Sequence, residues 1–172
     1  YGLTKANETS KNKSYKRFES IQNNFSLLNP RFLDELQMVC QKENISLLPY
    51  SPMAGGVLSG KYNSDFYPQN ARFSMYLKSD NPRVQAMASR FVNDKTIAAT
   101  KKYLELAKKH DISPVTMAIA WSKQHDFVAS TIIGARKVEQ LDDSFASLDL
   151  VLTDEILEEI KNIQADIMYP MG

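Results

Sequence analysis

Three clusters of small, polar and basic residues could bind a ligand, because each follows a short apolar run of the sequence. They are Gln22-Asn23, Tyr50-Ser51-Pro52 with Ala54-Gly55-Gly56, and Gly134-Ala135-Arg136-Lys137. Small residues let a ligand approach the backbone, basic side chains bind anions, and the aromatic ring can stack on a flat group. Each cluster alone also has a purely structural explanation, such as a strand cap, a core aromatic or a solvated helix start. Their occurrence after three separate runs favours one shared ligand site.

The third cluster has the composition of an anion site. Gly134 permits close approach of a ligand, and the helix expected after it presents free N–H groups and the positive end of its dipole. Arg136 and Lys137 add two full positive charges. Further along the same helix, Gln140 and Asp143 could bind the polar groups of a ribose or an adenine. A phosphate-bearing ligand is therefore the natural occupant.

The segments that end at or just before these clusters have the lengths of strands. Residues 18–23, 45–49 and 127–133 are too short for helices, and the second and third are mostly apolar, which is typical of strands buried in a parallel sheet. Helical segments separate them, so their order favours a parallel α/β sheet. About three strands are too few for a doubly wound sheet of ordinary size. Two architectures stay open: a small open α/β domain, and part of a β/α barrel whose other strands lie outside this sequence.

Cap signals predict where the helices begin. Four starts are marked by Asn29-Pro30, Asn93 or Asp94, Ser113-Pro114 and Thr153, and a further helix, the fourth in chain order, is predicted from Lys137. The corresponding helices are predicted to end near Glu43, His110, His125, Leu148 and Ile167. The fourth helix is expected to carry four apolar residues on one side, namely Val138, Leu141, Phe145 and Leu148.

Two segments are expected to lack regular structure. Residues 4–16 are almost entirely polar and have no apolar periodicity, which indicates a flexible loop. A second irregular segment is predicted from the glycine-rich stretch after Tyr50 to about residue 92, and it contains Pro68 and Pro82. Loops of this length in a compact domain are usually functional or disordered.

Composition and charge argue against several classes of protein. The 172 residues are 43% hydrophobic and 24% charged, as in globular proteins, and the formal net charge is +1. No global charge favours nucleic acid as a partner, and no apolar run reaches the roughly 18 residues that span a membrane. The lone Cys40 cannot form an internal disulfide, which predicts a reducing, cytoplasmic location. No cysteine or histidine spacing indicates a metal site.

Three stretches of the sequence together resemble successive segments of an aldo-keto reductase. They are IQNNFSLLN, LLPYSPMAGGVLSGKY and STIIGARKVEQLDDSFASLDLVLT. They occur in the family's order and at roughly its spacing, from about Glu19 to the end, and the similarity is greatest to the branch of Tas-type reductases and potassium-channel β-subunits. The resemblance implies that residues 1–172 are the carboxy-terminal portion of a single (β/α)8 barrel, incomplete in this chain.

The resemblance also implies an NADP site. Gln22 would bind the nicotinamide carboxamide, and Tyr50 would stack on the nicotinamide ring. The loop lining the pyrophosphate corresponds to Ser51, Pro52, Met53 and Ala54, with basic residues Lys61 and Arg72. The adenosine 2′-phosphate and adenine would be bound by Gly134, Arg136, Gln140 and Asp143, while Ser144 stands where channel β-subunits carry an asparagine. A basic residue at position 136 favours NADP over NAD.

The family's catalytic residues have no counterpart in this sequence. Its catalytic tyrosine, lysine, aspartate and histidine belong to an amino-terminal half, so we nominate no catalytic residue and interpret His110 and His125 as surface or helix-end residues. The parent protein is expected to reduce aldehydes or ketones with NADPH, whereas this segment alone should be inactive without the missing half as partner. Two alternatives stay open: a cofactor-binding regulatory subunit like the channel β-subunits, and an open α/β binding domain unrelated to reductases.

Overall fold

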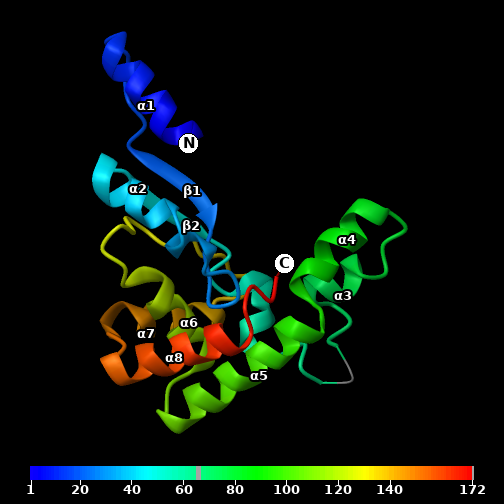
Figure 1. The fold of residues 1–172 in the computed structure, drawn as a ribbon. Helices are drawn as coiled ribbons and strands as arrows, with labels where there is room; N and C mark the ends of the chain where they lie inside the picture. Colours follow the sequence, from blue (N-terminus) through cyan, green and yellow to red (C-terminus); the bar gives the residue numbers. More distant parts are fainter. Residues whose placement is uncertain (65–66, 172) are drawn as a thin grey trace.

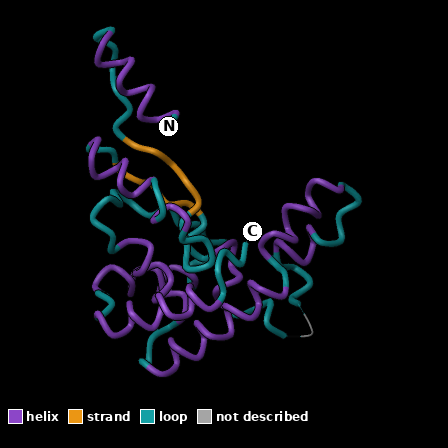
Figure 2. Tube along the Cα trace, viewed as in Figure 1, coloured by secondary structure: helices purple, strands orange, loops and turns teal. Residues whose placement is uncertain are grey.

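The computed structural model describes residues 1–64 and 67–171 and combines a small parallel sheet with many helices. In chain order the elements are α1 Gly2–Asn12, β1 Ser20–Asn24, η1 Arg31–Leu33, α2 Leu36–Glu43, β2 Ser46–Tyr50, η2 Ala54–Ser59, α3 Arg72–Tyr76, α4 Pro82–Phe91, α5 Asp94–Lys109, α6 Pro114–Lys123, α7 Gln140–Asp149 and α8 Asp154–Asp166. Figure 1 shows α1 and α2 near the sheet, α6, α7 and α8 grouped at one end, and the α3–α4 hairpin projecting from the body. Figure 2 shows how little of the chain is strand.

The two strands are parallel, as the sequence predicts. Ile21 pairs with Leu47, and Asn24 pairs with Tyr50, so the carboxyl ends of β1 and β2 meet at one edge of the sheet. The chain passes from β1 to β2 through η1 and α2, which is the connection that a parallel pair requires. The expected parallel α/β organisation is therefore confirmed in this part of the chain.

The third predicted strand, residues 127–133, is only partly formed. It runs parallel to β2 but makes two isolated bridges, Leu47 with Val128 and Tyr50 with Ile132. The amide of Ala129 donates to the carbonyl of Leu47, whereas the amide of Ile132 donates to that of Pro49. These two donors, Ala129 and Ile132, are three positions apart, whereas their acceptors on β2, Leu47 and Pro49, are two positions apart. The third segment therefore contains one extra residue, which interrupts the ladder.

Helices α5, α6 and α8 begin where the sequence predicts. Asn93 caps α5 with a reciprocal capping box, and Pro114 occupies the first turn of α6. The Thr153 hydroxyl accepts from the Ile156 amide at 3.4 Å and caps α8. Cap chemistry depends on neighbouring residues, which is why these starts could be read from the sequence.

The helix before β2 begins later than predicted. Pro30 precedes the 3-10 turn η1, and the α-helix starts at Leu36 rather than at Pro30. The Asn29 side chain donates to Asn24 Oδ1 at 3.0 Å instead of capping the helix. A bond back to the end of β1 has replaced the cap that the sequence indicated.

The expectation of a loop over residues 4–16 is wrong for residues 4–12, which belong to α1. The helix is held by polar contacts rather than by an apolar stripe. Asn7 Oδ1 accepts from the Phe18 amide at 2.9 Å, and its Nδ2 donates to the Phe18 carbonyl at 3.4 Å. Periodicity of apolar residues could not reveal a helix that is docked through an asparagine.

The predicted irregular segment after Tyr50 also contains helices. η2, α3 and α4 lie within it, while residues 65 and 66 of this segment lie outside the described residues. Asn81 accepts from the Arg83 amide at 3.0 Å and Pro82 follows it, so α4 begins with the same cap-then-proline signal as other helices of the chain. The prediction overlooked this signal.

α7 begins at Gln140 rather than at the predicted Lys137, and the apolar side predicted for this helix is largely exposed. Phe145 and Leu148 are 59% and 61% exposed, and Val138, which precedes the helix, is 76% exposed. The buried residues of α7 are Ser144 and Ser147. Small side chains let α7 pack closely against α6, so packing rather than hydrophobicity determines which side of α7 is covered.

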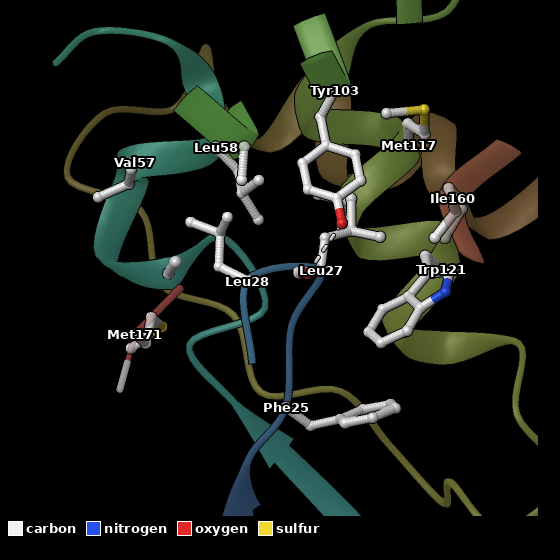
Figure 3. Close-up of a cluster of buried hydrophobic side chains, with 14 of the residues drawn as sticks. Phe25, Leu27, Leu28, Val57, Leu58, Tyr103, Met117, Trp121, Ile160 and Met171 are labelled. Atoms are coloured by element: carbon white, nitrogen blue, oxygen red, sulfur yellow. Dashed lines mark hydrogen bonds between the residues drawn. The ribbon is translucent and has the colours of Figure 1, made fainter. Parts of the chain in front are cut away.

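The core forms where the segment after β1 meets α5, α6 and α8 (Figure 3). Phe25, Leu27 and Leu28 are fully or almost fully buried there. The Tyr103 hydroxyl of α5 donates to the Leu27 carbonyl at 3.1 Å, so a polar group within the core is satisfied. Burial raises the pKa of Tyr103, which keeps its hydroxyl neutral.

His125 follows the carboxyl end of α6, as its interpretation as a helix-end residue predicts, and its partly buried ring packs against this core. Its ring lies 5.1 Å from Phe25, 5.0 Å from Trp121 and 5.2 Å from Phe127, measured between ring centroids. Its Nε2 is buried and has no hydrogen-bond partner within the described residues. Desolvation lowers the pKa of His125 to about 4, so the ring is neutral at physiological pH.

Candidate functional site

The strand ends place two predicted ligand residues on one face of the sheet. Gln22 pairs with Leu48 and Asn24 with Tyr50, so Gln22 and Tyr50 alternate onto the same side. That side is open: Gln22 is exposed, and Tyr50 is 39% exposed. The opposite side carries Ile21 and Leu47 toward the core. Tyr50 thus has a ring face available for stacking beside an exposed amide.

The loop after β2 is tightly folded, with several residues at positive φ. Ser51 and Ala54 have φ of 55° and 48°, followed by two glycines. Pro52 and Ala54 are buried, so any contact of these two with a ligand would be made by backbone. A Cβ on Gly55 would lie 2.5 Å from the ring of Phe73, and one on Gly56 would lie 2.6 Å from Lys61 Nζ. Glycine is therefore required where this loop contacts Phe73 and Lys61.

Lys61, Arg72 and Arg136 come together beside this loop, and we call them the basic cluster. Desolvation lowers the pKa of Lys61, and the charges of Arg72 and Arg136 lower it further. Arg136 Nη1 also donates to the Asn70 carbonyl at 3.2 Å, which ties the segment after the third strand to the segment before α3. The sequence offered no signal for Asn70, since the contact joins residues far apart in the chain.

Among the residues that the structure describes, the positive charge of the basic cluster has no carboxylate partner. Within residues 1–64 and 67–171, no carboxylate lies within salt-bridge distance of any of its three side chains. An anion bound among them would relieve the mutual repulsion that disfavours the charged form of Lys61. Phosphate groups suit such a site because guanidinium groups bind them in a bidentate manner.

The structure gives the remaining predicted residues varied surroundings. Gly134 is exposed, has no positive φ, and has open space where a Cβ would be. Gln140 Oε1 accepts from the amides of Arg136 and Lys137 at 2.8 and 3.2 Å, so Gln140 caps this turn. Its carbonyl oxygen is thus used within the protein, while its amide nitrogen remains a potential donor.

Asp143 and Ser144 contact other parts of the protein rather than the basic cluster. Asp143 accepts from the Thr116 hydroxyl, at 3.0 Å through its carbonyl and 3.4 Å through Oδ1. Ser144 is buried, and its hydroxyl donates to the Gln140 carbonyl at 3.5 Å. Sequence position alone could not show that these two side chains lie on the side of α7 that packs on α6.

Comparison with known proteins identifies the family. A model of the aldo/keto reductase family matches residues 2–165. The chain belongs to this family. The resemblance of its three sequence stretches is thereby confirmed, and an α/β domain unrelated to reductases is excluded.

Relatives and a solved structure add detail to this family membership. The protein tas of Escherichia coli is 34% identical over 154 residues, covering 90% of this chain and 42% of that protein. A putative aryl-alcohol dehydrogenase of Schizosaccharomyces pombe is 29% identical over 94% of this chain and 46% of its own length. A probable voltage-gated potassium channel subunit beta of rice is 30% identical over 69% of this chain and 35% of its own length.

The glycerol dehydrogenase from Gluconobacter oxydans has a similar structure, with a TM-score of 0.68 and 25% sequence identity. The alignment covers 91% of this chain and 45% of that enzyme. The chain therefore spans less than half the length of each of these proteins. No helix among the described residues has the length and apolar character needed to cross a bilayer.

Proposed function

We propose that this chain is the cofactor-binding portion of an NADPH-dependent oxidoreductase that reduces aldehydes or ketones. The observation that carries the proposal is the basic cluster, Lys61, Arg72 and Arg136, beside the carboxyl ends of the parallel strands. In β/α barrels this is the edge at which ligands bind. Family membership and the dehydrogenase names of relatives support the same class of reaction.

The residues of this chain would bind and orient the cofactor. NADPH supplies the hydride when it is bound. Lys61 and Arg72 would neutralise the pyrophosphate, and Arg136 would bind the 2′-phosphate that distinguishes NADP from NAD. Tyr50 would stack on the nicotinamide ring, and Gln22 would donate to its carboxamide. These contacts determine which face of the nicotinamide meets a substrate.

The remaining strands of the barrel and the catalytic acid would come from an amino-terminal portion of the protein. The sheet described here has two strands, β1 and β2, whose exposed face carries Gln22 and Tyr50. A closed barrel would cover this face and exclude water from the hydride transfer. A small carbonyl compound would bind between the two portions. The buried, free thiol of Cys40 fits a reducing, cytoplasmic setting.

A second candidate function is a cofactor-binding regulatory subunit. The similarity to the rice protein named as a potassium channel subunit beta favours it. Both functions need the same cofactor site. They differ in turnover, because a regulatory subunit needs to bind NADPH but not to consume it.

Steady-state turnover by the full-length protein tests this proposal. We expect loss of NADPH absorbance that depends on an added aromatic aldehyde and is much slower with NADH. Binding of NADPH without aldehyde-dependent turnover would favour the regulatory function. A protein that neither binds nor oxidises NADPH would refute both candidates.

A further inference from the structure

A histidine and two glutamates meet where the end of α5 packs against the first turns of α8. His110 is the residue that ends α5, while Glu155 and Glu159 are four residues apart and therefore lie on one face of α8. One ligand atom from each residue lies within 4.8 Å of the other two. We propose that His110, Glu155 and Glu159 bind a divalent transition-metal ion, with Zn²⁺ the best match.

The ligand types and their separations suit zinc. Imidazole nitrogen and carboxylate oxygen bind Zn²⁺ at roughly 2.0–2.2 Å, so ligand atoms in a tetrahedral site are about 3.4 Å apart. The His110 Nε2 to Glu159 Oε1 distance is 2.8 Å, and the widest separation among the three is below 4.8 Å. Small side-chain rotations would equalise these distances. An imidazole ligand favours Zn²⁺ over Mg²⁺ or Ca²⁺, and three protein ligands leave a fourth position for water.

The cluster already binds a positive charge, the ammonium group of Lys109. Its Nζ lies 2.8 Å from Glu159 Oε2 and 3.8 Å from Glu155 Oε1. Two carboxylates and one ammonium leave a net negative charge where the carboxyl end of α5 meets the first turns of α8.

The position of Lys109 shows that the cluster attracts a cation, and the Lys109 ammonium would compete with a metal ion for the same carboxylates. Its side chain is 55% exposed, so it can swing into solvent when a divalent ion binds. The metal would then join α5 to α8 directly in place of the ion pair. The ligands come from two helices separated by more than forty positions in the sequence, which is why no spacing motif indicated them.

Titration of the full-length protein with ZnCl₂ tests the proposal by calorimetry and by thermal unfolding. We expect saturable binding of one ion and a rise in Tm. Glu155→Gln should weaken binding at least tenfold, since even outer-shell partners of metal ligands are worth about 10- to 100-fold. Glu155 is exposed, and its one ion pair within residues 1–64 and 67–171 is with Lys109 at 3.8 Å, so this variant should fold normally. Glu158→Gln is the matched control, because Glu158 pairs with Lys161 on the same helix and lies outside the cluster.

A second variant distinguishes a metal site from a cluster that only forms ion pairs between α5 and α8. Lys109→Met removes the competing ammonium, so zinc affinity should increase. Failure to observe saturable binding would overturn the proposal. So would equal affinities for Glu155→Gln and Glu158→Gln, which would place the ion elsewhere, or a Lys109→Met variant that binds zinc no better than the unmodified protein.

Discussion

Replacement of Gly55 by alanine should destabilise the protein through a clash with a buried ring. Gly55 has φ of 64°, and its added Cβ would lie 2.5 Å from Phe73 Cζ and 2.6 Å from Cε2. Phe73 is 2% exposed, and its ring stacks on Phe91 with centroids 4.9 Å apart. The ring therefore has no free space into which it can move.

The expected cost follows from two contributions. An alanine in the left-handed region costs roughly 1–2 kcal/mol. Forcing a methyl group into a packed core costs about 1–3 kcal/mol. Together they predict a loss of about 2–5 kcal/mol in the free energy of unfolding for Gly55→Ala, to be measured by urea denaturation of the full-length protein.

Gly134→Ala is the matched control for this measurement. Its Cβ would have no atom within 4 Å, and its φ is not in the left-handed range, so the change in unfolding free energy should stay within about 0.5 kcal/mol. A Gly55→Ala protein as stable as the Gly134→Ala protein would refute the argument that the loop after β2 is packed against Phe73.

Three further predictions concern the core and the helix caps. The pKa of His125 falls from 6.5 to about 4 on folding. The contribution of His125 to the free energy of unfolding should therefore be complete above about pH 6.5 and decrease by at most about 3 kcal/mol toward pH 4. Urea titrations at several pH values should show this loss in the unmodified protein and not in His125→Phe. Tyr103→Phe leaves the Leu27 carbonyl without its hydroxyl donor and should cost about 1–3 kcal/mol in the same assay. Asn93→Ala removes the capping box of α5 and should lower stability by about 1 kcal/mol, visible as a lower Tm; unchanged values would contradict each assignment.

Local chemistry made much of the fold predictable from the sequence. The starts of α5, α6 and α8 depend on Asn93, Pro114 and Thr153, whose effects act within a few residues. The short apolar run at residues 45–49 identified β2, because a buried strand needs apolar residues along its length, whereas β1 is mostly polar and was expected only from its length and position. The sequence also indicated Lys61, Arg72 and Arg136 as candidate anion-binding residues, but it could not show that their three side chains lie close together.

Features that depend on long-range contacts were missed. α1 is held by the bonds between Asn7 and Phe18, which no periodicity predicts. The buried side of α7 is set by its serines against α6, so Phe145 points away from the core. The interruption of the third strand arises from an extra residue opposite β2, which composition does not reveal. Each of these depends on a partner distant in the sequence.

The central claim is that the basic cluster binds the phosphates of NADPH, and fluorescence titration of the full-length protein with NADPH and NADH tests it most directly. Arg136→Ala should weaken NADPH binding by roughly 10- to 100-fold, as expected for loss of a charge-assisted hydrogen bond, while NADH affinity changes little. Arg83→Ala, which removes an exposed arginine of α4 outside the cluster, should change neither affinity. An Arg136→Ala protein that keeps its NADPH affinity, or loses NADPH and NADH equally, would contradict the account.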